Sequence, residues 1–541
     1  MKKNNLGFTL IESVIAIAVF AVLSSIIYFT YFNIVNLSTQ LRLRSLAIYL
    51  INNQIEIIRN IPYENVGIQG GFPVGKLLAE QTLTTANINF LLKTTIRNID
   101  DPFDGTLGGT PNDTAPADYK LVELEISSPS FSSFAPLKFT TSVAPKNLET
   151  ATNNGALFIN VFDAFAQPIK NANVSVVNNK VSPTIRINDV TNNSGVLQLV
   201  DIPTSTNGYA VKISKSGYSS DQTYLLGDPD NPNPVKPDAT VASQQVTDIS
   251  FAIDKISTIN LKTSDKTCQP IPDINFLQNG TKLIGHNPDV LKYSTSSATD
   301  ANGEKNISNL EWDTYNFSNL NNNYDLAGYN PLLPIILNPD STIALSWLME
   351  PKNPTALLLT IQDANGQLIN DALVRLTKTG FDQTLYSGQR SFSRTDELIG
   401  TSSISTTFDF GSPDIAFYNL SWEPQDPSLS FQIATNNDNT IWNFLGPDGT
   451  PSTFYTTSNT PIFSGQSNNR YLRYRVDNST STSEEIKIDF HSSCSPDGQA
   501  FFNGLTKDTY NLTVQKTGYQ DFSTNLSVTQ NWQESKITLS Q

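Results

Sequence analysis

Residues 8–32 read FTLIESVIAIAVFAVLSSIIYFTYF, and this apolar stretch decides how the 541-residue chain is organised. Glu12 is its only charged side chain. At a rise of about 1.5 Å per residue, a helix of this length crosses a bilayer core of about 30 Å. Lys2 and Lys3 precede the stretch. The positive-inside rule therefore places the amino terminus in the cytoplasm and the residues after the stretch outside.

A processing motif lies at the start of the apolar stretch. The chain begins MKKNNLG, a short basic leader that ends in Gly7, and continues FTLIE, which starts at Phe8 and has Glu12 as its fifth residue. This arrangement resembles the prepilin processing site of type IV pilins and pseudopilins. The resemblance implies that a membrane prepilin peptidase cleaves after Gly7 and methylates the new amino terminus at Phe8.

The same resemblance implies a role for Glu12 in assembly. In that family the glutamate pairs with the amino-terminal ammonium of a neighbouring subunit. A lone charge in hydrocarbon is costly, and a pair of opposite charges is less so. The alternative interpretation is a plain signal anchor, which leaves Glu12 without a function. The expected partners are the prepilin peptidase, other pilin or pseudopilin subunits and the membrane.

After a leader at residues 1–7, the pattern predicts one pilin helix over residues 8–61, with a transmembrane part at about 8–32. Pro62 ends it. Residues 62–150 are expected to form a small head with an acidic loop. The carboxylates of this loop belong to Asp100, Asp101, Asp104, Asp113 and Asp118. Oxygen ligands of this kind suit calcium, although no EF-hand spacing is present. A calcium loop and a solvated acidic turn both remain open.

The rest of the chain repeats itself. FINVFDAFAQPIKNANVSV at 158–176 aligns with LLTIQDANGQLINDALVRL at 358–376, and INLKTSDKTCQPIPDINF at 259–276 is a weaker copy. Each copy then reaches a glycine turn: NNSG, DANG or SPDG. Alternating apolar residues and such turns predict β-strands. The pattern resembles the carboxypeptidase regulatory-like β-sandwich, a module without peptidase activity, which implies a spacer or interaction domain.

The repeats predict β-sandwiches at residues 151–255, 256–351 and 352–385 plus 494–541. In the second copy TYNFSNL stands where the closing strand is expected. The third copy is split by residues 386–493, whose aromatic strand-like segments predict an inserted β-sandwich or jelly roll. Its aromatic side chains either fill a core, with Trp422 and Trp442 inside, or form a sugar-binding surface. The expected fold class is mainly β, with a long amino-terminal transmembrane pilin helix, a small head and several β-sandwich domains, one of which carries the inserted domain.

Composition narrows the range of functions. A formal net charge of −15 argues against nucleic acid as a partner. The only histidines, His286 and His491, lie in no protease or zinc spacing. We therefore expect no enzyme activity and no cofactor other than the calcium discussed above. The only cysteines, Cys268 and Cys494, lie outside the membrane, where either one disulfide or two free thiols is expected.

These features predict a large minor type IV pilin or pseudopilin. It would be a single-pass membrane protein with a cytoplasmic amino terminus and a large extracellular domain on the cell surface, assembled into a filament or its tip. Two alternatives remain open. One is an adhesin that presents a domain for a surface glycan or protein ligand on a pilin anchor, and the other is a pseudopilin of a type II secretion machine.

Overall fold

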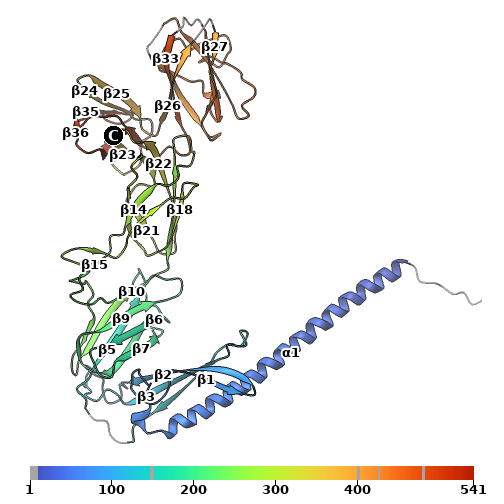
Figure 1. Ribbon diagram of the computed structural model, residues 1–541, viewed down its shortest axis with the longest axis vertical. Coiled ribbons are helices and arrows are strands. Elements are labelled where there is room, and N and C mark those ends of the chain that lie inside the picture. Colours follow the sequence, from blue (N-terminus) through green and yellow to red (C-terminus); the bar gives the residue numbers. More distant parts are fainter. Residues whose placement is uncertain (1–9, 147–150, 399–401, 424–426, 478–481) are drawn as a thin grey trace, which may run out of the picture. The chain divides into compact units, whose positions relative to one another are not determined.

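The computed structural model describes residues 10–146, 151–398, 402–423, 427–477 and 482–541. One long helix is followed by sheets, as the sequence predicts (Figure 1). The chain divides into two compact units. Unit 1 contains the described residues up to Asp254 together with Ile284–Val290, and unit 2 contains Lys255–Leu283 and Leu291–Gln541.

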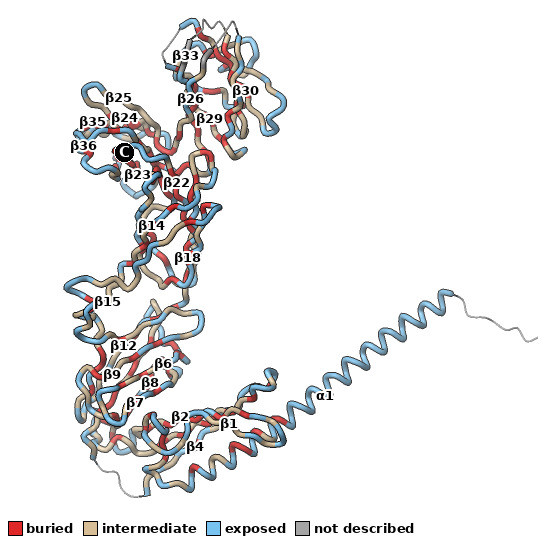
Figure 2. The backbone as a smooth tube through the Cα atoms, viewed as in Figure 1, coloured by how far each residue is buried: buried red, intermediate tan, exposed pale blue. Residues whose placement is uncertain are grey.

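Unit 1 begins with the helix α1 (Leu10–Asn60), which ends before Pro62 because proline disfavours helical angles in the residue before it. Its amino-terminal part is exposed along its whole circumference, and its buried residues lie only from Leu43 to Ile58 (Figure 2). Among the described residues, α1 is the one helix long and apolar enough to cross a membrane.

The carboxyl-terminal half of α1 packs on the head. A 3₁₀ turn, η1 (Tyr63–Asn65), leads into an antiparallel sheet in the order β1–β2–β3–β4. Its strands are β1 (Glu80–Thr85), β2 (Ile88–Ile99), β3 (Tyr119–Ser127) and β4 (Leu137–Val143). Alternate residues of β3 are buried, so that one face of the sheet shares a core with Leu43, Ala47 and Ile51 of the helix.

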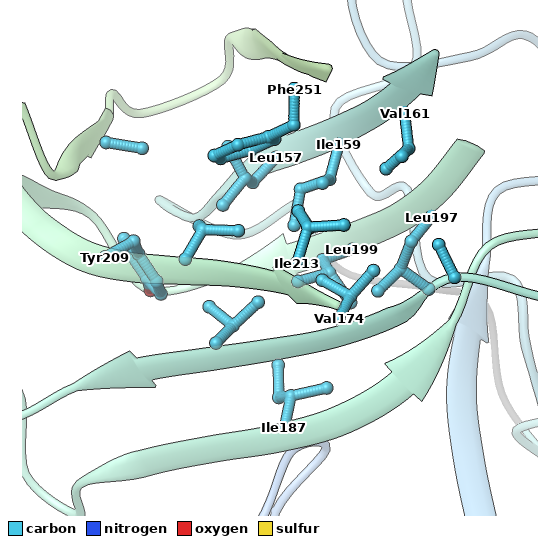
Figure 3. Packing of buried hydrophobic residues seen from close by; sticks show 14 of the residues in the cluster. Leu157, Ile159, Val161, Val174, Ile187, Leu197, Leu199, Tyr209, Ile213 and Phe251 are labelled. Atoms are coloured by element: carbon cyan, nitrogen blue, oxygen red, sulfur yellow. The ribbon is translucent and has the colours of Figure 1, made fainter. Parts of the chain in front are cut away.

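The first repeat, module 1, has two sheets around one core. One sheet contains β5 (Gly155–Phe162), β8 (Val196–Ile202) and β12 (Val246–Ala252), and the other contains β6 (Asn173–Asn178), β7 (Ile185–Val190), β9 (Ser205–Ser214), β10 (Asp221–Gln222) and β11 (Ala239–Val241). Side chains of both sheets point toward a common interior, among them Ile159, Val174 and Ile213 (Figure 3).

Module 2, in unit 2, repeats this plan. One sheet contains β13 (Ser257–Ser264), β18 (Glu304–Leu310), β20 (Tyr324–Asn330) and β22 (Thr342–Pro351), and the other contains β14 (Asn275–Asn279), β17 (Ser294–Ala298), β19 (Asp313–Asn319) and β21 (Ile335–Leu337). The short strands β15 (Leu283–Gly285) and β16 (Val290–Leu291), which pair with each other, lie at the two ends of the stretch Ile284–Val290 that belongs to unit 1. TYNFSNL, which departs from the repeat pattern, nevertheless forms β19, and β19 pairs with β14 as β9 pairs with β6.

Module 3 is built from residues on both sides of the inserted segment. One sheet contains β23 (Ala356–Asp363), β34 (Gln499–Phe502) and β37 (Trp532–Leu539), and the other contains β24 (Leu373–Lys378), β25 (Phe381–Tyr386), β35 (Asp508–Gln515) and β36 (Phe522–Val528). In all three modules the first strand pairs in parallel with the last: β5 with β12, β13 with β22 and β23 with β37.

The inserted domain also has two sheets. One contains β26 (Arg390–Leu398), β29 (Ala416–Glu423), β31 (Thr460–Pro461) and β33 (Thr482–His491), and the other contains β27 (Ser402–Ile404), β28 (Phe408–Asp409), β30 (Ser430–Asn436) and β32 (Tyr471–Asp477). A 3₁₀ turn, η2 (Ser464–Gln466), precedes β32. Arg390 lies opposite Phe490 in the β26–β33 pair, so the two ends of the domain are adjacent.

The repeated sequence landmarks have a physical cause. The carboxylates of Asp163, Asp265 and Asp363 each accept backbone N–H groups two and four residues later, at 2.8 or 2.9 Å. The carbonyl oxygens of Gly195, Gly303 and Gly498 each accept an N–H group of the module's first strand. In module 3 this bond, from Ile361 to Gly498, spans the insertion. The repeated residues therefore make equivalent hydrogen bonds in the three modules.

Candidate functional site

The first candidate site is the amino-terminal part of α1. Glu12 lies in the first described turn of the helix, whereas Gly7 and Phe8 lie outside the described residues. Hydroxyl groups in this part donate back along the helix: Ser25 to the carbonyl oxygen of Ala21 and Thr30 to that of Ile26, both at 2.8 Å. Internal hydrogen bonds of this kind suit a hydrocarbon environment, which offers polar groups no water.

The acidic loop, between β2 and β3, is the second candidate. The Asp100 carboxylate accepts the N–H of Leu107 at 2.9 Å, and the Asp113 carboxylate accepts that of Ala115 at 2.8 Å. The Asp118 carboxylate accepts the N–H of Asp101. These carboxylates therefore hold the turns of the loop by binding its own backbone.

Burial and neighbouring carboxylates raise the pKa of Asp100 to about 6. The neighbours are Asp113, Asp118 and Asp104. Among the described residues, no group of three or more His, Cys, Asp or Glu side chains is arranged to hold a metal ion. Calcium binding by this loop stays a prediction.

The third candidate is a joint in unit 2, where modules 2 and 3 meet the inserted domain. Cys268 of module 2 and Cys494, at the re-entry into module 3, form a disulfide with their Cα atoms 5.6 Å apart. The amide of Gln499 hydrogen-bonds to both backbone groups of Tyr329, donating to its carbonyl at 2.7 Å and accepting its N–H at 3.0 Å. The Trp532 indole N–H donates to the Leu326 carbonyl at 2.8 Å. A covalent bond and a polar network thus connect the two modules.

Arg390 brings the inserted domain into this joint. Its guanidinium group donates to the carbonyl oxygens of Gln499 at 3.1 Å and Ala327 at 3.3 Å, one from module 3 and one from module 2. The side chain is buried, and this burial lowers the pKa of Arg390 to about 10. Neither Arg390 nor Gln499 carries a recognisable signal in the sequence, because their contacts join segments far apart in the chain.

The start of the insertion differs from its predicted position at residue 386. β25 runs to Tyr386, and the Ser387 hydroxyl accepts the Ala372 N–H at 3.0 Å and donates to the Ile369 carbonyl at 2.6 Å. In module 1 the hydroxyl of Thr191 makes the equivalent pair of bonds with Ala172 and Ile169. Ser387 therefore belongs to module 3.

The inserted domain has an aromatic core and an aromatic outer face. Trp422 is buried in the core, as predicted, with its ring 4.7 Å from that of Phe431. Trp442 is half-buried and is not part of this core, so the expectation that it lies inside is wrong. It stands on the outer face of the sheet, where the Arg473 guanidinium carbon lies 4.6 Å from its ring centre.

The two histidines lie in different surroundings. His286 is exposed and faces Asp289 at 3.4 Å, and His491 ends β33, with its Nδ1 2.7 Å from the Gly388 carbonyl oxygen.

Arg473 is a candidate functional residue that the sequence analysis did not identify. The alternation in YLRYRV, residues 471–476, was a signal that could have found it, because period-2 alternation turns both of its arginines outward.

Comparison with protein families finds the prokaryotic N-terminal methylation motif at residues 2–28. The match covers the leader and the first part of the apolar stretch. A search of curated proteins finds no match. The motif is therefore the one comparison that bears on function.

Solved structures show distant likenesses. The Bacillus anthracis TIE protein is 11% identical, with 86% of this chain and 73% of that chain covered and a TM-score of 0.17. Shaft pilin SpaA of Lactobacillus rhamnosus GG is 11% identical over 36% of this chain and 98% of its own, with a TM-score of 0.15. A minor pilin of Streptococcus agalactiae is 13% identical over 37% and 99%, with a TM-score of 0.17. At such TM-scores these likenesses carry no argument about this chain.

Proposed function

We propose that this chain is a large minor subunit of a type IV filament, which displays three repeated β-modules and an inserted domain at the cell surface. The observation that carries the proposal is the prepilin-type motif at residues 2–28, continuous with the apolar helix α1. The motif implies processing by a prepilin peptidase and assembly with other pilins. A minor position follows from bulk, because so many residues on one helix would crowd a filament built only of this chain.

The proposed assembly step uses one charge pair. Cleavage after Gly7 frees the amino group of Phe8, and Glu12 lies four residues further along the chain. The ammonium of one subunit and the Glu12 carboxylate of its neighbour would then neutralise each other in the membrane, where each charge alone is costly. The role is structural, and no catalytic step is proposed.

Two variants test this assignment. We expect mass spectrometry to show that the mature chain starts at N-methylated Phe8. We expect Glu12→Ala to be cleaved normally yet absent from filaments sheared off the cell. Glu56→Ala is the matched control, because Glu56 is an exposed glutamate of the same helix at the level of the head. Normal incorporation of the Glu12→Ala chain would contradict the proposed charge pair.

A type II secretion pseudopilin is the second candidate that the same motif permits. Antibodies against residues 402–423 and 427–477 of the inserted domain separate the two on intact cells. A filament subunit exposes this domain to the antibodies, whereas a pseudopilin that stays beneath the surface does not.

A further inference from the structure

The outer face of β32 presents a row of arginines. Leu472, Tyr474 and Val476 are buried in the core of the inserted domain, and the residues between them point outward. Arg473 lies opposite Ala434 of β30. Because Ala434 carries only a methyl group, the Arg473 side chain has room to lie across the strand pair toward Trp442.

Arg473 is held in place without being neutralised. Its Nε donates to the Thr407 hydroxyl at 2.8 Å, and that hydroxyl donates to the Asn439 side chain at 2.9 Å. Within the part of the chain that the structure describes, its terminal Nη atoms have no hydrogen-bond partner and it forms no ion pair. A fixed guanidinium group with two free donor nitrogens is prepared to bind an anion.

The neighbouring arginines differ, because each has a carboxylate partner. Arg470 pairs with Asp409 at 2.7 Å, and Arg475 pairs with Asp477 at 3.3 Å. The positive charge available on this face is therefore localised at Arg473. A single localised charge can bind one carboxylate of a ligand, whereas nucleic acid binds by neutralising many phosphates.

Apolar surface lies beside this charge. Ile441 is 69% exposed, and the adjacent Trp442 is half-buried, with no acceptor for its indole N–H among the described residues. Phe444 and Phe454 continue the apolar surface beside Arg475. An aromatic ring and a fixed cation thus lie together on one face, and an exposed apolar side chain, that of Ile441, precedes the aromatic residue in the chain.

From this geometry we propose that the outer face of β32 binds acidic polysaccharides whose sugar rings carry a carboxylate. The carboxylate accepts parallel hydrogen bonds from the Nη atoms of Arg473. The apolar C–H face of the sugar ring packs against Ile441 and the exposed part of Trp442, whose N–H donates to a sugar hydroxyl. The proposal deepens the proposed surface display of this domain and rests on it, because a ligand outside the cell requires that exposure.

The test measures binding of the mature full-length chain, purified in detergent, to immobilised polygalacturonate and to polysialic acid. Methyl-esterified polygalacturonate is the control ligand, since it keeps the sugar ring and lacks the charge. We expect the charged polymers to bind and the ester not to bind. Arg473→Gln and Trp442→Ala should each weaken binding about tenfold or more, the loss of one charge-assisted or aromatic contact. Arg473→Lys should also weaken it, because an ammonium group lacks the planar pair of donors.

Arg375→Gln is the matched control variant. Arg375 is an exposed arginine of module 3, paired with Asp382, and its removal changes the net charge by the same amount. We expect it to bind as the parent chain does. Thermal unfolding of each variant checks the fold.

Four results would overturn the proposal: no binding to either charged polymer, equal binding of the ester, full binding by the Arg473→Gln chain, or an equal loss in the Arg375→Gln chain. The assay uses no filaments. A Glu12→Ala chain that fails to assemble should still bind, so failure of this proposal can be distinguished from failure of the proposed function.

Discussion

Asp100 shows how burial changes the chemistry of a single side chain. Its pKa in the folded chain is about 6, against an ordinary value of 3.8, because it is half-buried and lies near other carboxylates. The folded state thus holds this proton more tightly than the unfolded state, and the stability it contributes at low pH is lost as the pH rises from about 4 to about 6. We expect Asp100→Asn to raise the Tm at pH 7.5 and to change it little at pH 4, as measured by calorimetry.

The same measurement addresses calcium. With EGTA present, a lower Tm of the Asp100→Asn chain at pH 7.5 would contradict the expectation that the ionised Asp100 destabilises the folded chain. If calcium binds the acidic loop, CaCl₂ should raise the Tm of the parent chain, and Asp100→Asn should remove that rise, because it removes a charged oxygen ligand.

Trp422 and Trp442 show what sequence patterns resolve at single residues. Trp422 lies in β29, a regular strand whose alternation fixes which residues face the core. Trp442 lies in a connection that pairs with β30 through isolated bridges, such as the one between Ile433 and Leu445, and not through a continuous strand. Without a continuous strand, the period of the sequence does not determine which way a side chain points.

At the scale of elements, the sequence predicts the long helix, the β class and the repeat. The repeat can be recognised in the sequence because few other residues can replace its aspartates and glycines. The aspartate side chains bind backbone N–H groups, and the glycines adopt backbone angles that most residues avoid. The sequence does not predict which residues of one module contact another module. The contacts of Gln499 with Tyr329 and of Arg390 with Ala327 are examples. The contact of Leu358 could be predicted in part, because the run ALLLTI of β23, apolar apart from Thr360, is typical of a strand buried on both faces. The Leu358 side chain packs into the core of module 2.

The glycine turn before β34, which hydrogen-bonds to the first strand of module 3, allows a test of the repeat's hydrogen bonds. Gly498 has a φ of +62°, and a Cβ there would lie 2.8 Å from the Ile361 carbonyl oxygen. We expect Gly498→Ala to destabilise the module by about 2–4 kcal/mol in urea unfolding, because backbone strain and a steric clash add. Gly366 has a φ of +81° and open space around it, so Gly366→Ala should cost only about 1 kcal/mol. Equal costs would show that the close approach at Gly498 does not matter.

Unit 2 combines a core that two modules share with a core that belongs to the inserted domain alone. Module 3 contributes Leu358, Phe501 and Trp532 to the core of module 2. The disulfide between Cys268 and Cys494 connects the same two modules covalently. The described core residues of the inserted domain, by contrast, all come from that domain. Modules 2 and 3 therefore depend on each other for burial of apolar surface, whereas the inserted domain has a core of its own and contacts them through side chains such as Arg390 and Phe392.

This difference predicts the result of removing the inserted domain. We expect excision of residues 390–491, with Gln389 joined to Ser492 by a short Gly-Ser linker, to leave modules 2 and 3 folded. The cut ends are adjacent across the β26–β33 pair, and Ser387 and Cys494 are kept. The shortened chain should retain the disulfide and a cooperative calorimetric transition, with a Tm a few degrees lower because the carbonyls of Ala327 and Gln499 lose the Arg390 donors. Residues 388–492 expressed alone should also unfold cooperatively, since their core is their own. Loss of the transition in the shortened chain, or a disordered circular dichroism spectrum of the isolated segment, would mean that modules and insertion fold only together.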